Sequence, residues 1–175
     1  INARSEDTVV LNTSFMYHFV NILNGYSGII MPTKKPKILR LFNRDNRLQK
    51  LPVQVVITTP DFCMETEILF QEVEEVYIGG AVLNLYEAEL IRNKFQNAKI
   101  TYIYGATECN LICKTDLDEY INNLKKGQTV LGEAVSGVCI KTDENNEIMV
   151  HSDVVLTAYL NPENKRGVVV ENGLY

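Results

Sequence analysis

The chain has 175 residues, of which 46% are hydrophobic and 22% are charged, so it can bury a globular core and neither half has a disordered composition. Its net charge of −5 argues against a nucleic-acid partner, because binding to phosphate backbones needs a basic surface. No apolar run reaches the roughly 18 residues of a membrane span, and no signal-peptide pattern opens the sequence. The cysteines, Cys63, Cys109, Cys113 and Cys139, match no zinc-ligand spacing and favour free thiols in the reducing cytoplasm.

Short apolar runs alternate with helical patterns over the first part of the chain. We predict strands at residues 28–31, 53–57, 75–78 and 100–104, and helices at residues 36–48, 61–71 and 83–97. Asp61 stands where it would cap the second of these helices. The β-α-β-α order predicts a parallel sheet with right-handed crossovers.

The pattern changes after Gly127. Short strands are predicted at residues 130–131, 138–141 and 147–151, with a turn at 142–146 between the last two. We therefore expect an α/β part, residues 1–127, followed by the start of a small β subdomain, residues 128–175. The predicted fold class is α/β, with a parallel sheet flanked by helices and then a small antiparallel β unit.

Two polar segments follow predicted strands and carry the most information about function. Gly79-Gly80-Ala81 follows the strand at 75–78, and Tyr104-Gly-Ala-Thr-Glu108 ends the strand at 100–104. Open α/β sheets bind ligands at the carboxyl ends of their strands, where glycine permits close backbone approach. A ring, a hydroxyl and a carboxylate in one turn suit a nucleotide with Mg²⁺. The alternative is a structural turn in which Thr107 caps a helix beginning near Glu108.

The second segment resembles the YGxTE motif of AMP-forming acid-activating ligases. This superfamily comprises acyl-CoA synthetases, luciferase and the adenylation domains of nonribosomal peptide synthetases. Further segments resemble family motifs in the same order along the chain: residues 79–81, 130–138, 146–150, 156–163 and 171–175. The resemblance covers nearly the whole chain and implies that its fold is part of a larger AMP-binding domain.

The resemblance implies ATP or AMP and Mg²⁺ as ligands. The ring of Tyr104 would stack on adenine, and the backbone of Gly79, Gly80, Ala81 and Gly105 would line the nucleotide pocket. Thr107 would bond the α-phosphate and Glu108 would hold Mg²⁺, which makes these two the catalytic candidates. The implied reaction is attack of a carboxylate on the α-phosphate of ATP. It yields an acyl-adenylate for transfer to a carrier-protein phosphopantetheine or a CoA thiol.

Residues 9–25 are similar to a segment of the amino-acid-activating domains. Asn12 stands where those domains place an aspartate for the substrate's ammonium, and an amide offers no full counter-charge. The resemblance therefore favours an aryl acid or another carboxylate without that ammonium. The rest of the implied substrate pocket is mostly apolar: Thr13, Met16, Val76, Ile78, Ile103, Leu111 and Ile112. The alternative is that these are core residues of helices and strands.

The chain also departs from the family pattern. Tyr102 replaces an asparagine of many relatives, Ala106 a proline, and Asn146 and Ala158 replace glycines. The sequence has no Ser/Thr/Gly-rich phosphate loop, no RTGD aspartate and no lid lysine, so we expect a fragment that is inactive alone. Two readings remain open, namely part of an active ligase, of the carrier-loading or the CoA type, and a non-catalytic scaffold or nucleotide-binding domain.

Overall fold

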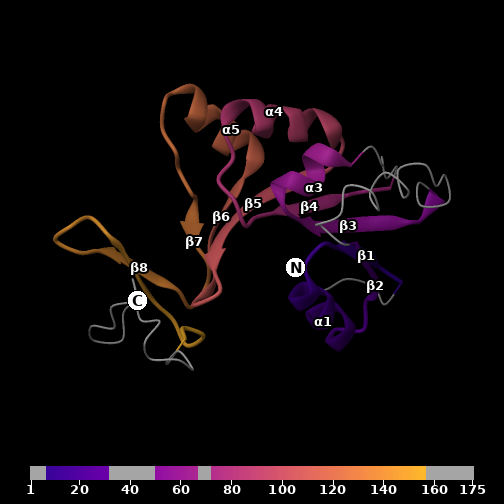
Figure 1. Ribbon diagram of the computed structural model, residues 1–175, viewed down its shortest axis with the longest axis horizontal. Helices are drawn as coiled ribbons and strands as arrows, with labels where there is room; N and C mark the ends of the chain where they lie inside the picture. Colours follow the sequence, from indigo (N-terminus) through magenta and orange to yellow (C-terminus); the bar gives the residue numbers. More distant parts are fainter. Residues whose placement is uncertain (1–6, 32–49, 67–71, 157–175) are drawn as a thin grey trace.

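The computed structural model describes residues 7–31, 50–66 and 72–156. Seven strands form one mixed sheet in the order β2-β1-β3-β4-β5-β6-β7 (Figure 1). The first five pair in parallel, and β6 and β7 are antiparallel to their neighbours. The strands are β1 (Val9–Asn12), β2 (Ser27–Ile30), β3 (Val53–Thr58), β4 (Glu75–Ile78), β5 (Lys99–Ala106), β6 (Asn110–Asp116) and β7 (Glu133–Ala134). The predicted parallel sheet is confirmed, while the predicted helix at 36–48 lies outside the described residues.

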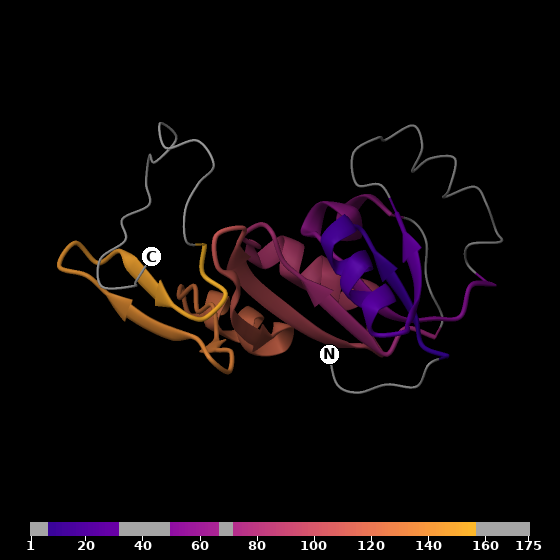
Figure 2. The same cartoon turned by 90° about the horizontal axis from the view of Figure 1, so that it is seen from below.

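Helices cover both faces of the sheet. The helix α1 (Phe15–Leu23) lies on one face, and α3 (Pro60–Glu65), α4 (Leu85–Lys94) and α5 (Leu117–Lys125) lie on the other (Figure 2). The larger core packs beneath α3, α4 and α5 and includes Val56, Val76 and Ile100, all fully buried. The smaller core beside α1 is built on Val10, Val55 and Ile57. Among the described residues, no helix is long and apolar enough to cross a membrane.

Two predicted helices differ from the observed ones at their ends. Asp61 does not cap α3: the N-cap residue is Thr59, and Pro60 opens the helix, because proline's fixed φ and missing N–H suit the first helical position. The helix ends at Glu65, since Thr66 is extended. The helix predicted at 83–97 is α4, shortened at both ends. The side chains of Asn84 and Glu87 bond each other's backbone N–H in a capping box that sets its start.

The predicted small antiparallel unit is present. The strands β8 (Cys139–Thr142) and β9 (Ile148–His151) form a two-stranded antiparallel sheet. Asp143 shapes their turn, because its carboxylate accepts from the backbone N–H of Asn145 and of Glu147 at 2.9 and 2.7 Å. The predicted strand at 130–131 is wrong: the strand is β7, which pairs with β6 and extends the large sheet past residue 127. The division of the chain at residue 127 stays a prediction.

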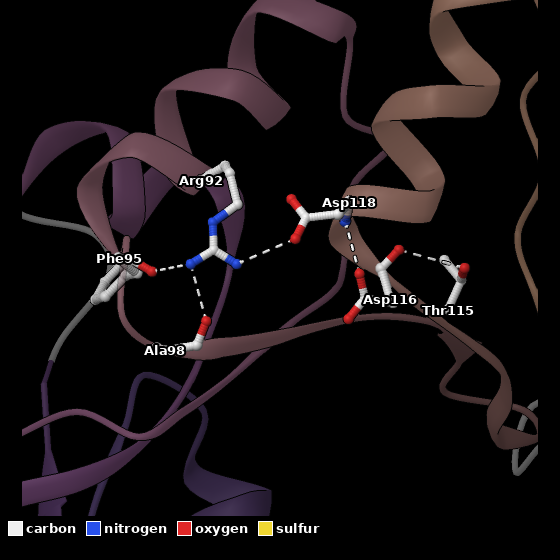
Figure 3. Close-up of polar contacts among 6 residues, drawn as sticks. All are labelled: Arg92, Phe95, Ala98, Thr115, Asp116 and Asp118. Atoms are coloured by element: carbon white, nitrogen blue, oxygen red, sulfur yellow. Dashed lines mark hydrogen bonds and ion pairs between the residues drawn. The ribbon is translucent and has the colours of Figure 1, made fainter.

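Arg92 ties the end of α4 to the strand and the helix that follow (Figure 3). Its guanidinium donates to the backbone carbonyl of Phe95 and, at 2.9 Å, to that of Ala98, and it lies 3.6 Å from the Asp118 carboxylate. Asp118 belongs to α5, whose N-cap Asp116 accepts from the Asp118 N–H at 2.9 Å. One cation therefore satisfies carbonyl groups at the end of α4 and faces the negatively charged first turn of α5.

Replacing Arg92 should lower stability. In Arg92→Met the apolar stem remains while the carbonyl groups of Phe95 and Ala98 lose their donor, so we expect a loss of about 1–2 kcal/mol in the free energy of unfolding. Urea denaturation followed by circular dichroism measures this loss. The control is Lys125→Met, which removes an exposed pair with Glu89 at 2.9 Å and should cost at most about 0.5 kcal/mol. Equal losses in the two variants would contradict this account of Arg92.

Candidate functional site

The carboxyl ends of β1, β3, β4 and β5 meet at one edge of the sheet. The chain goes from β1 to β2 on one side, while β3 lies on the other side of β1. The helix α1 covers one face and α3 the other, so the topology reverses between β1 and β3. Open α/β sheets bind ligands in the crevice at such a reversal. Thr13 follows β1 and Thr58 ends β3, and their hydroxyl oxygens are 3.1 Å apart.

A pocket of about 640 Å³ opens at this edge, on the α1 side of the sheet. It brings together eight of the residues predicted from the sequence: Thr13, Met16, Gly79, Gly80, Ile103, Gly105, Thr107 and Leu111. The remaining lining residues are Ser14, Tyr17, Val20, Ile57, Thr58, Thr59, Ala106, Asn110 and Val154. The nucleotide candidates and the substrate candidates therefore share one cavity.

Other predicted site residues lie outside the lining of this pocket. Val76 and Ile78 are fully buried in the core beneath α3, α4 and α5, on the opposite face of the sheet. Ile112 is buried in a separate cluster with Cys109, Cys113 and Val150. Asn12 is fully buried, and its amide nitrogen and oxygen have no hydrogen-bond partner among the described residues. Ala81 is exposed on the loop after β4.

Tyr104, Thr107 and Glu108 lie at a β-hairpin, where β5 turns into β6. The helix start near Glu108 that the alternative reading required is wrong, because Thr107–Cys109 forms the turn and β6 begins at Asn110. Tyr104 is half-buried and packs against the Cys109 and Val150 cluster. The exposed Thr107 lines the pocket, and the backbone carbonyl of Glu108 accepts from the Leu156 N–H at 2.6 Å. The segment after β9 thus fastens onto this turn.

The described lining of the pocket contains no charged side chain. Its polar groups are hydroxyls from Thr13, Ser14, Tyr17, Thr58, Thr59 and Thr107 and the amide of Asn110. Hydroxyl groups donate and accept hydrogen bonds without adding charge. Apolar groups from Met16, Val20 and Ile103 cover other parts of the wall. This combination suits a ligand that has an apolar body and a few polar groups.

Sequence reasoning missed Thr58 and Thr59 as lining residues. The strand at 53–57 was predicted, and the two threonines follow it just as Gly79 and Gly80 follow β4. The rule that ligands meet the carboxyl ends of parallel strands would have selected them. Nothing in the local sequence points to Val154, because it reaches the pocket from beyond β9.

Gly79 is required by close packing between β4 and β5. A Cβ atom at this position would lie 2.5 Å from Cγ1 and 2.8 Å from the carbonyl oxygen of Ile103. We therefore expect Gly79→Ala to force the strand ends apart and to lower the free energy of unfolding by about 1–3 kcal/mol. Chemical denaturation measures the loss, with Ala81→Ser, at an exposed position two residues later, as the control. A Gly79→Ala variant as stable as the control would refute the packing argument.

The sequence matches no protein-family model. It is 25% identical over 144 residues to the D-alanine–D-alanyl carrier protein ligase of Staphylococcus epidermidis, a match that covers 78% of this chain and 28% of that protein. The chain therefore spans less than a third of the length of this curated relative.

Solved structures share the fold at low sequence identity. IdnL7 matches with a TM-score of 0.78 at 16% identity, over 99% of this chain and 40% of that one. The N-terminal domain of FACL13 from Mycobacterium tuberculosis matches with a TM-score of 0.70 at 17% identity, over 100% and 48% of the two chains. O-succinylbenzoate coenzyme A synthetase from Bacillus subtilis gives 0.69 at 17%, over 99% and 39%.

The motifs from Gly79 to Glu108 lie at the strand edge that the resemblance requires, and the carrier protein ligase match covers most of the chain. The sheet, its helices and the small antiparallel pair match part of the N-terminal domain of these enzymes. The chain is therefore similar in sequence to a carrier protein ligase, and it shares the fold of part of the N-terminal domain of these solved structures, as the resemblance to AMP-forming ligases and adenylation domains implies.

Proposed function

We propose that this chain supplies part of the nucleotide- and acid-binding site of an AMP-forming ligase. The reaction is ATP-dependent activation of a carboxylic acid as an acyl-adenylate, for transfer to the thiol of a carrier-protein phosphopantetheine or of CoA. The single observation that carries the proposal is the pocket in which Gly79, Gly80 and Thr107 face Thr13 and Met16. Thr13, Gly79, Gly80 and Thr107 lie in segments that follow three strands, and Met16 lies in the first turn of α1. The resemblance to the superfamily motifs supports a role for them in binding the nucleotide and the acid.

Within this proposal each loop has a separate task. The exposed Thr107 hydroxyl bonds the α-phosphate, and the backbone of Gly79, Gly80, Ala81 and Gly105 lies along the nucleotide. Tyr104 offers its ring to adenine from the same hairpin. On the other side of the pocket, Thr13, Met16, Ile103 and Leu111 surround the acid.

Glu108 fits a magnesium ion only with help from a ligand. The described residues contain no group of three or more His, Cys, Asp or Glu side chains that could hold a metal. Magnesium is usually held by one or two carboxylates together with substrate phosphates and water. A single carboxylate at the hairpin turn beside Thr107 fits that pattern, and the bound ion would neutralise phosphate charge there.

The uncharged lining favours an acid with no other charged group. Asn12 is a neutral amide behind the pocket wall, and no lining side chain described carries a negative charge. An ammonium group buried here would lack a counter-charge, which is costly in a medium of low dielectric constant. The favoured substrate is therefore an aryl acid or an apolar carboxylic acid, activated in the cytoplasm.

The second candidate is a nucleotide-binding or scaffold domain without catalysis. It is favoured by the same uncharged lining, since a triphosphate normally needs a lysine and backbone N–H groups around its β- and γ-phosphates. A scaffold domain would not bind AMP, whereas the first candidate predicts AMP binding through Thr107, so the affinity for AMP distinguishes these two.

We expect the chain to bind AMP through Thr107. Thr107→Ala removes the hydroxyl that bonds the phosphate and should weaken AMP binding about tenfold, the effect of a hydrogen bond to a charged group. Isothermal titration calorimetry with AMP measures it, and Thr142→Ala, at an exposed position on β8, is the matched control. Equal AMP affinity in the Thr107→Ala variant and wild type would exclude this role.

We expect no turnover by the 175-residue chain alone. With ATP, Mg²⁺ and a panel of aryl and aliphatic acids, a pyrophosphate-release assay should give the background rate, because the sequence lacks the phosphate loop and the lid lysine. The positive control is a known adenylation enzyme assayed with its own acid. Release of pyrophosphate above background would show that these parts are dispensable.

A further inference from the structure

The loop Gly79–Leu83 connects β4 to α4 and forms part of the pocket edge. Gly80 lines the pocket, and Val82 is 68% exposed. The loop is fixed where it begins, because the Gly79 N–H donates to the Thr58 carbonyl at 3.1 Å. It is also fixed where it ends, by the Asn84–Glu87 capping box. Between these points it belongs to no helix or strand.

Two buried tyrosines form hydrogen bonds to the backbone of this loop from the protein core. Tyr102 on β5 donates its hydroxyl to the Ala81 carbonyl at 2.9 Å, and Tyr120 on α5 donates to the Leu83 carbonyl at 2.9 Å. Their ring centroids are 4.5 Å apart, and the two side chains are 2% and 0% exposed. Alternate carbonyl groups of an exposed loop thus bond to one rigid aromatic pair in the core.

Both phenols are protonated hydrogen-bond donors at neutral pH. Burial raises the pKa of Tyr102 to about 12, with a smaller contribution from Tyr120, and burial also raises the pKa of Tyr120. A buried tyrosine with a partner for its hydroxyl combines a large apolar contact with one fixed polar bond. The pair is therefore suited to fixing the position of backbone atoms.

We propose that Tyr102 and Tyr120 are positioning residues that hold the loop Gly79–Leu83 in the conformation that binds the nucleotide. The proposal rests on the proposed function of that loop. A loop held in one conformation before binding loses less conformational freedom when the ligand arrives, and affinity rises accordingly. Without the two hydroxyls, the carbonyls of Ala81 and Leu83 lose their buried donors and the loop samples other conformations.

The test uses the full 175-residue chain with AMP as the probe. Tyr102→Phe and Tyr120→Phe keep the rings and remove only the hydroxyls. Ile91→Val removes one methylene from the same core at a residue that lies outside the loop, on α4, and so serves as the control for a loss of stability alone. Tyr86→Phe, at a 70% exposed tyrosine on α4, controls for loss of a phenol. Three quantities are measured for each variant: melting temperature, the amide hydrogen-exchange rates of residues 79–83, and the dissociation constant for AMP.

We expect Tyr102→Phe and Tyr120→Phe each to raise the dissociation constant for AMP about five- to tenfold, the effect of one lost hydrogen bond. Exchange of the loop amides should accelerate by a similar factor. Ile91→Val should lower the melting temperature comparably while its AMP affinity stays within about twofold of wild type.

If the loop amides of Tyr102→Phe and Tyr120→Phe exchange no faster than those of Ile91→Val, the two hydroxyls do not hold the loop; we call their hold on the loop the tyrosine clamp, and this result would overturn it. Faster loop exchange with AMP affinity unchanged would overturn the positioning role. If the wild-type chain fails to bind AMP, the proposed nucleotide site is overturned, and the exchange rates still decide separately whether the clamp exists.

Discussion

Parallel pairing of β1, β3, β4 and β5 is the constraint on which the site depends. Their registers are nearly level, since Asn12 pairs with Ile57, Thr58 with Ile78, and Ile78 with Tyr102. The segments that follow these strands therefore emerge together at one edge. Thr13 and Thr58 are 45 residues apart in sequence, yet their hydroxyls are in contact. A shift of one residue in any of these registers would turn alternate side chains to the other face and dismantle the pocket.

The two faces of the sheet differ in the size of the core that covers them. Beneath α3, α4 and α5 lies a continuous apolar core in which most side chains are fully buried. On the α1 side the core cluster consists of Val10, Val55 and Ile57, with tyrosines packed around it. The pocket opens on this second side, where Ile57 and Ile103 form part of its wall. The full core on one face gives the loops a rigid base, while the smaller core on the other leaves room for a ligand.

The sequence predicted the central strands and the polar loops after them, because β-branched runs and glycine pairs are local signals. It also predicted that Gly79, Thr13 and Thr107 would share a site, through the rule for parallel strands and the family motifs. The strand β6 and the helix α5 were missed, although Asp116 before Leu117, Tyr120 and Ile121 is a helix-start pattern. The side of each strand that meets a helix was not readable from short apolar runs, which is why Val76 and Ile78 were expected in the pocket. The bonds of Tyr102 and Tyr120 to the loop depend on tertiary packing, for which no local pattern exists.

The helix α1, which lies on the pocket side of the sheet, is less well packed than the helices on the other face. Its apolar side chains Phe15, Met16, Phe19 and Leu23 are more than half exposed. Its buried side includes Nδ1 of His18 and Nδ2 of Asn21, which have no hydrogen-bond partner among the described residues. Each such buried group costs on the order of 1–3 kcal/mol, and the exposed apolar face adds little in return. The helix therefore contributes less to stability than α4 or α5, and Met16 and Val20 place it against the pocket. Binding sites draw on the less stable parts of a fold, and here the less stable layer is the one that lines the pocket.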